Sequence, residues 1–223
     1  SGPMPVQLAL RATSAWPDHS QGTLKVALRG PLSDLHIQAS GVLQPAQRGS
    51  QSLDLEGRLQ PFAAWPVSAL KASAKALDLS QLLGSLPRTS LSGVVEVAPV
   101  QTLSPTQRAP SKPGSAGVSD LGVRISVRNA DARSWDQHGL PVLGLSGGVT
   151  LHDVSRLKTW QEVWAVALWD LHAALPTNQA SRTATLGMSG SLHRGNTLRI
   201  ALDGVEPLAL HARAPALQLQ GQI

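Results

Sequence analysis

The chain has 223 residues, of which 42% are hydrophobic and only 15% are charged, and its formal net charge is +5. It contains no cysteine, which excludes disulfide bonds, thiol catalysis and thiolate metal sites. The basic residues are scattered along alternating segments without aromatic neighbours, which argues against a nucleic-acid binder. The mild basic excess is somewhat more typical of contact with an anionic membrane surface.

The two ends of the sequence predict a piece of a longer protein. Residues 1–5 read SGPMP, which we interpret as a cloning remnant, and the last residues stop within an alternating segment. The sequence has no signal peptide, and none of its apolar runs reaches the roughly 18 residues of a membrane span.

The dominant pattern is alternation of apolar and polar residues with period two, which is typical of β-strands with one buried face. Short segments of this kind, separated by Gly, Pro, Asn or Asp, predict about a dozen strands and less than a fifth of the chain in helices. Ten of these segments are 23–29, 35–41, 52–59, 91–97, 122–128, 145–151, 185–192, 197–203, 207–212 and 217–223. The sequence therefore predicts a mostly β fold, either a two-sheet sandwich or one long sheet folded into a trough.

The first break in the alternation is the stretch 77–93, LDLSQLLGSLPRTSLSG. It predicts one short helical turn at residues 78–83, with Asp78 or Ser80 as its cap. Pro87 prevents extension of this turn. The stretch that begins at Asp170, DLHAALPTNQASRTATLGMSG, indicates a second detour of the same kind. The segments before the two aspartates, SALKASAKALDL and VWAVALWDL, are similar, which indicates a repeat.

The second break covers residues 154–171 and has two readings. Leu157, Trp160 and Trp164 have helical spacing, so a helix is one prediction. The repeat instead favours helix or coil only near 154–160, with a strand from about Val163.

A long segment divides the two halves of the chain. Residues 101–117 read QTLSPTQRAPSKPGSAG, whose composition predicts a mobile loop. The predicted organisation is therefore a first repeat at 6–100, this loop, and a second repeat at 118–223.

The side chains that carry chemistry in enzymes form no convincing constellation. GLSGG at 144–148 matches the nucleophile elbow of hydrolases, but alternating strand follows the serine where the elbow needs a helix. The carboxylates are scattered, and no glycine loop fits phosphate binding. Ligand spacing for a metal is lacking among the seven histidines, which are His19, His36, His138, His152, His172, His193 and His211. The sequence predicts neither an enzyme nor a cofactor or metal site.

The six tryptophans lie near turns and strand ends, where edge packing is the simplest role. The alternative is a position at the mouth of a hydrophobic groove, where an amphipathic ring suits a wet boundary. They are Trp16, Trp65, Trp135, Trp160, Trp164 and Trp169.

The apolar phase of the predicted strands defines one candidate surface. Its members share a phase within each segment, so we expect them to line a continuous aliphatic interior. They are Leu24, Val26, Leu28, Ile37, Leu55, Val95, Val97, Ile125, Val127, Val149, Met188, Ile200, Leu202, Leu210 and Leu219.

Three segments together resemble the TamB family, the inner-membrane-anchored subunit of the translocation and assembly module, whose members are AsmA-like. They are GTLKVALRGPLSDLHIQASGVLQ, ALDLSQLLGSLPRTSLSGVVEV and NTLRIALDGVEPLALHARAPALQLQGQI. The family repeat is Leu-Asp-Leu followed by Pro-x-Thr-x-Leu-x-Gly. The second copy departs from it, with Asp170-Leu171-His172 and no Pro-Arg-Thr.

The resemblance implies a long U-shaped antiparallel sheet, called a β-taco, with an aliphatic groove. It also implies a periplasmic location, with the full-length protein anchored in the inner membrane of a Gram-negative bacterium. The implied function is bridge-like phospholipid transport between inner and outer membrane. The alternative within the family is a role in outer-membrane protein assembly or autotransporter secretion, with a β-barrel partner.

The residues themselves agree with the lipid role, because an aliphatic trough offers acyl chains a surface of their own polarity, at about 0.8 kcal/mol per buried methylene. Two other functions stay open. One is a scaffold or chaperone whose edge strands receive another protein by β-augmentation. The other is an inert structural β-segment.

Overall fold

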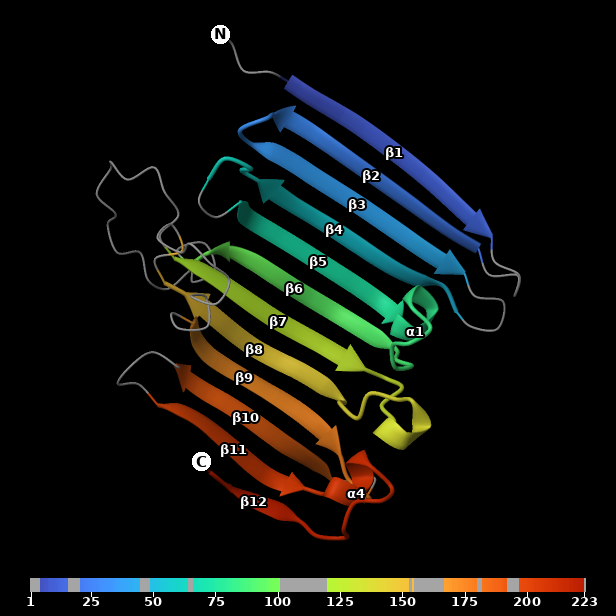
Figure 1. Ribbon diagram of the computed structural model, residues 1–223, viewed down its shortest axis with the longest axis vertical. Coiled ribbons are helices and arrows are strands. Elements are labelled where there is room, and N and C mark those ends of the chain that lie inside the picture. The colour runs from blue at the N-terminus through green and yellow to red at the C-terminus, as the bar shows by residue number, and fades with distance from the viewer. Residues whose placement is uncertain are drawn as a thin grey trace.

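The computed structural model forms one β-sheet of twelve strands, shown in Figure 1. It describes residues 5–15, 21–44, 49–63, 66–100, 120–152, 154, 167–179, 182–191 and 197–222. The strands are β1 (Pro5–Ala15), β2 (Gln21–Pro31), β3 (Leu35–Gln44), β4 (Gln51–Leu59), β5 (Val67–Leu77), β6 (Leu91–Pro99), β7 (Leu121–Asn129), β8 (Gly144–Leu151), β9 (Ala167–Pro176), β10 (Thr183–Ser191), β11 (Leu198–Val205) and β12 (Leu219–Gln222).

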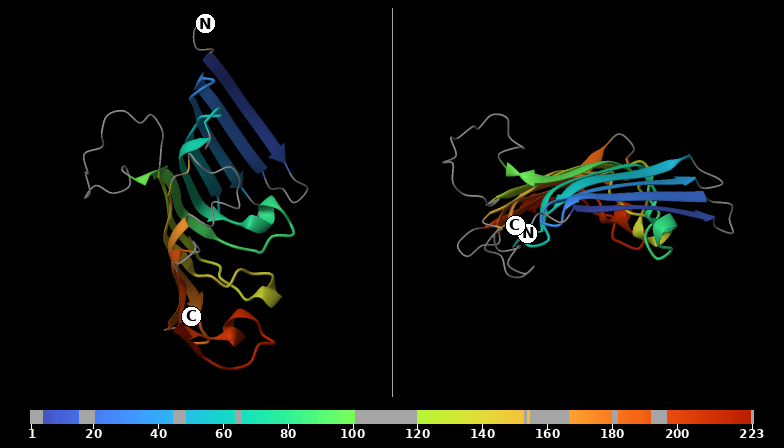
Figure 2. Two further views of the ribbon diagram at one scale, coloured as in Figure 1. Left: turned by 60° about the vertical axis from the view of Figure 1, so that its left-hand side comes forward. Right: turned by 90° about the horizontal axis from the view of Figure 1, so that it is seen from above.

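The topology is a simple meander in which every strand pairs antiparallel with the next one along the chain. β6 and β7 pair across residues 101–119, so both halves of the chain belong to the same sheet. The sheet is open and twisted, and it is neither closed nor strongly curled (Figure 2). The predicted mostly β, antiparallel fold is confirmed at this level, and a two-sheet sandwich is wrong.

The predicted helical turn after Leu77 is confirmed. It is α1 (Leu79–Leu82), and the side chain of Asp78 caps it by accepting a hydrogen bond from the backbone N–H of Ser80. Two more short turns follow later in the chain, η1 (Trp135–Gln137) and α4 (Pro207–Leu210). α1, η1 and α4 all lie in connections between strands.

The segment 207–212 was predicted as a strand, and that prediction is wrong because α4 occupies it. Pro207 stands at the start of α4, where its missing N–H costs nothing and its fixed φ favours a helix. The alternation of Leu208 and Leu210 is too short to distinguish a strand from one helical turn.

The predicted second detour at Asp170 is also wrong. Asp170 lies in the middle of β9 with an exposed side chain, whereas Asp78 is buried at a strand end. The corner that follows α1 along the sheet instead lies at residues 129–143, between β7 and β8. The similarity of the two Asp-Leu sequences therefore reflects strand alternation and no shared corner.

Glycine is needed where neighbouring strands approach closely. Gly147 of β8 and Gly190 of β10 have φ angles of 125° and 107°, in the region that side chains rarely adopt. A Cβ atom at Gly147 would lie 2.0 Å from the carbonyl oxygen of Asp170 in β9. The Gly144–Gly148 stretch is thus a strand segment in close contact with its neighbour, and it forms no nucleophile elbow.

Some predictions fall on residues that the structure does not describe. These are the loop at 101–117, the helix or coil at 155–160 and the strand from Val163 to 166; strand structure is described from Ala167 onward. Trp16, Trp65, Trp160, Trp164, His19 and His193 also lie outside the described residues.

The polar face of the sheet carries charges of alternating sign on neighbouring strands. Glu56, Lys71, Glu96 and Arg124 are consecutive cross-strand partners from β4 to β7. The Lys71 Nζ to Glu96 Oε1 distance is 2.9 Å. Opposite charges facing each other across a ladder favour this register over slipped ones.

We expect Lys71→Met to raise the pKa of Glu96 toward its ordinary value of 4.5. The hydrogen bond from Lys71 and its charge lower the pKa of Glu96, and those of Glu96 raise the pKa of Lys71 above 10.5. The Lys71–Glu96 pair therefore contributes its full stabilisation between about pH 4.5 and pH 10.5. It is lost as pH falls through the lowered pKa of Glu96 or rises through the raised pKa of Lys71.

The measurement is a side-chain carboxyl NMR titration of Glu96. Lys75→Met is the matched control, because Lys75 lies on the same strand and pairs with Ser52. An equal shift of the Glu96 pKa in both variants would contradict the assignment.

Candidate functional site

One face of the sheet, which we call the apolar face, consists of three rows of cross-strand partners that run from β1 to β11. The middle row is Leu10, Val26, Ala39, Leu55, Ala72, Val95, Ile125, Gly147, Leu171, Met188 and Ile200. The upper row is Leu8, Leu28, Ile37, Gly57, Leu70, Val97, Val123, Val149, Trp169, Gly190 and Leu198. The lower row is Ala12, Leu24, Gly41, Leu53, Ala74, Gly93, Val127, Leu145, Ala173, Leu186 and Leu202.

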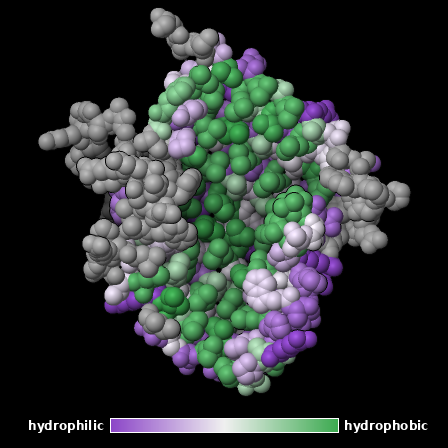
Figure 3. All heavy atoms as spheres, in the orientation of Figure 1, coloured by the Kyte–Doolittle hydropathy of each residue, from purple (hydrophilic) through white to green (hydrophobic). Residues whose placement is uncertain are grey.

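These rows contain no charged side chain and a single aromatic one, Trp169. With strands about 4.8 Å apart, the apolar face extends about 50 Å across the sheet. Figure 3 shows it as a broad hydrophobic area in the centre of the view, with hydrophilic residues along the rim. Exposed apolar patches larger than several hundred Å² are typical of interaction surfaces.

The residues predicted to line an interior are placed on this face by the strand registers. Those in β2 to β11 belong to the three rows. Leu219 of β12 lies opposite Val205, on the same side as Leu202. Leu210 is on α4 instead of a strand, and it packs against the cluster of Leu175, Ala184 and Val205.

The C-terminal part of the apolar face is partly covered, and the N-terminal part is not. Leu121, Val149, Leu151 and Ala167 are buried together with Val154. In contrast, Leu8 and Leu10 of β1 are 53% and 56% exposed, and Leu24 and Leu53 are also exposed. The region over β1–β4 is therefore the most exposed part of the apolar face.

A groove of about 380 Å³ lies on this uncovered region. Its walls include Leu24, Gly41 and Leu53 from the strands, together with Gln81 and Leu82 of α1. The described residues around it carry no charge and no aromatic ring. The connection that contains α1 therefore forms one side of the groove.

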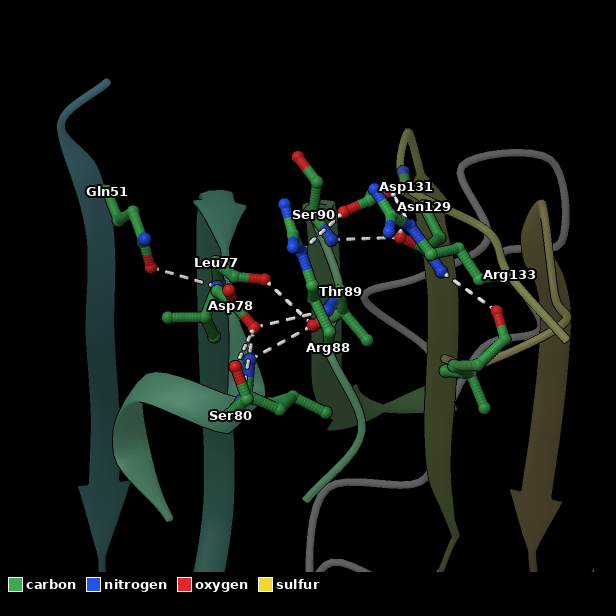
Figure 4. A network of polar contacts seen from close by, with 12 residues as sticks. Gln51, Leu77, Asp78, Ser80, Arg88, Thr89, Ser90, Asn129, Asp131 and Arg133 are labelled. Atoms are coloured by element: carbon green, nitrogen blue, oxygen red, sulfur yellow. Dashed lines mark hydrogen bonds and ion pairs between the residues drawn. The ribbon is translucent and has the colours of Figure 1, made fainter. Parts of the chain in front are cut away.

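A polar network fixes the position of α1 (Figure 4). The buried Asp78 Oδ1 accepts hydrogen bonds from the Ser80 N–H at 3.1 Å, the Ser80 hydroxyl at 2.7 Å and the Thr89 N–H at 3.1 Å. The Asp78 N–H donates to the side-chain oxygen of Gln51 at 2.9 Å. Asp78 thus joins α1 to β4 and to the segment before β6.

The corner at 129–143 is held by a second buried side chain, Asn129. Its Oδ1 accepts hydrogen bonds from the N–H groups of Ser90 and Asp131, and its Nδ2 donates to the carbonyl of Leu140. Asp131 in turn pairs with Arg88 at 3.1 Å and with Arg133. The network of Asp78 therefore continues into the next corner, as Figure 4 shows.

A third corner, residues 206–217, contains α4 and connects β11 to β12. Asp136 of η1 joins it to the second corner. Its carboxyl group accepts a hydrogen bond from the backbone N–H of Ala212, which follows α4, at 3.1 Å. That bond, helped by one from Ser134, lowers the pKa of Asp136. In Figures 1 and 2 the helical turns of these three corners lie at the ends of the strands, on the same side of the sheet.

Sequence reasoning found the cap Asp78 but missed Asn129, Asp136 and the edge strand β1. An Asn followed two residues later by Asp at a strand end is a turn signal that points to Asn129. The partner of Asp136 is 76 residues away, so local sequence carries no signal for it.

The described histidines and carboxylates meet in pairs and form no larger metal-binding group. Among the described residues, no group of three or more such side chains has the geometry to hold a metal ion. His172 contacts Asp170 and His152 contacts Asp120, both at exposed positions. None of the helices in the described part of the chain has the length and apolar character that a membrane crossing requires.

No protein-family model, curated protein or solved structure matches this chain.

Proposed function

We propose that this chain is a segment of a lipid-transfer protein that carries phospholipid acyl chains along its apolar face. The observation that carries the proposal is the set of three uninterrupted, uncharged rows from β1 to β11. Each methylene that leaves water for such a surface gains about 0.8 kcal/mol. The rows offer no charged trap, so a bound chain is free to move from strand to strand.

The resemblance to the TamB family supplies the wider setting of this proposal. The full-length protein is then anchored in the inner membrane and extends through the periplasm, and phospholipid passes between the two membranes. In this proposal the open sheet is one stretch of a longer U-shaped trough, with the apolar face inside and the charged ladder outside.

We expect purified protein to retain phospholipid. Mass spectrometry of organic extracts from the washed protein tests this, with an extract of a charged, similarly sized β-protein from the same host as the control. Extracts that contain no phospholipid above this control would contradict the proposal.

One observation favours a second function, a scaffold in outer-membrane protein assembly with a β-barrel partner. Among the described strands, β1 has a partner on one side only, and its 11 residues are a template for another strand. The variant Ala9→Lys distinguishes the two functions, because Ala9 lies on the polar face of the edge strand β1 and does not touch the apolar face. This edge charge should block strand addition and leave phospholipid retention unchanged.

A further inference from the structure

We propose that the groove beside α1 is a discrete seat that holds one acyl chain of a phospholipid. This inference rests on the proposed function and names the place where a chain is retained. We call the groove the α1 seat, formed by Leu24, Gly41, Leu53, Leu77, Gln81 and Leu82.

The shape of the α1 seat distinguishes it from the rest of the apolar face. Elsewhere on β1 and β2 the face is a sheet surface with exposed leucines, but here α1 adds a side wall through Leu82. The volume of about 380 Å³ falls within the range of about 300–1,000 Å³ for small-ligand sites. A wall on one side increases the area that a chain removes from water, so a chain should reside longer here than on the open rows.

The chemistry of the lining selects an acyl chain whose charged end stays outside. The described walls are aliphatic or uncharged, and the side-chain oxygen of Gln51 is already engaged by the Asp78 N–H. The lining offers no cation, so the charged end of the ligand stays in water and only a hydrocarbon chain enters the groove. The choice of a phospholipid follows from the proposed function.

Gly41 is the residue that leaves the centre of the floor empty. It lies in the lower row between Leu24 and Leu53. A Cβ atom at Gly41 would meet its nearest neighbours at 3.8 Å or more, which is ordinary contact, and its backbone is not in the left-handed region. In contrast, a Cβ atom at Gly57 would meet Leu70 at 2.9 Å. A side chain at Gly41 is therefore compatible with the strand and would occupy the seat.

The test uses the whole chain with phosphatidylcholine that carries a nitroxide near the methyl end of one acyl chain, delivered from vesicles. In the parent protein we expect line broadening of the methyl NMR signals of Leu24, Leu53 and Leu82. Gly41→Val removes contacts worth about two methylenes and should weaken this binding about tenfold. The matched control is Gly221→Val, because Gly221 lies on the same side in β12 with open space around it.

Full broadening at Leu24 and Leu82 in Gly41→Val would overturn the α1 seat, and so would equal losses in both glycine variants. Broadening of Met188 without Leu24 in the parent would reject the seat while the proposed function stands. Absence of broadening on the whole face would reject both. A nitroxide fatty acid that binds as tightly as the phospholipid would overturn the choice of ligand. If circular dichroism shows that Gly41→Val is unfolded, Leu82→Gln takes its place, because Leu82 is exposed and its substitution should change stability little.

Discussion

Asp78→Ala is expected to destabilise the protein by about 3–5 kcal/mol. The substitution removes the acceptor of two backbone N–H groups, those of Ser80 and Thr89, in a corner where Asp78 and Thr89 are both 1% exposed. Each buried donor left without a partner costs about 1–3 kcal/mol, and α1 also loses its cap. This is a large share of the roughly 5–15 kcal/mol that stabilises a typical domain.

Urea unfolding followed by circular dichroism measures this loss. Asp170→Ala is the matched control, since Asp170 follows a similar sequence but its side chain is 76% exposed. We expect it to change stability by less than about 0.5 kcal/mol. The stability loss of Asp78→Asn should lie between those of Asp78→Ala and Asp170→Ala, because an amide oxygen still accepts hydrogen bonds. Equal effects of Asp78→Ala and Asp170→Ala would show that the two positions are equivalent after all.

The strands could be predicted well because their alternation is long and regular. In segments such as 122–128, every second residue is aliphatic, and a shift by one residue would move all of these side chains to the other face. The phase therefore fixed which side chains share a face before any pairing was known. The same pattern is compatible with a sandwich, a trough or an open sheet, because curvature depends on twist and on close approaches such as that at Gly147.

The corners could be predicted only where their signals are local. Asp78 and Pro87 bracket α1 within ten residues, and this turn was found. α4 was missed because two alternating leucines resemble a strand, and the hydrogen bond from Ala212 to Asp136 depends on tertiary structure. The α1 seat was missed for the same reason, since its lining comes from α1 and from five strands, β1 to β5.

A charge at Ile125 should strongly lower phospholipid retention and leave the fold intact. Ile125 lies in the middle row between Val95 and Gly147, and it is only partly buried. Because the sheet is open, an aspartate there can turn toward water, so we expect Ile125→Asp to cost about 1–3 kcal/mol of stability. A chain that crosses this row must displace the hydration of the new charge, which lowers retention about tenfold or more.

The control for this prediction is the neighbouring position on the other face of β7. Ser126 is exposed and points away from the apolar face, so Ser126→Asp adds the same charge to the same strand without touching the rows. Ile200→Arg, with Ala201→Arg as its control, repeats the comparison on β11. Phospholipid in organic extracts and far-UV circular dichroism are the two measurements.

The outcomes separate three views of the apolar face. Loss of phospholipid in Ile125→Asp and Ile200→Arg, with folded protein and unchanged controls, is the result that a lipid path requires. If all four variants fold and retain phospholipid equally, lipid does not travel along the rows, and the edge strand β1 becomes the better candidate for function. If only the two variants on the apolar face unfold, that face is a core closed by another surface, because an unpaired charge is far more costly where water cannot reach it.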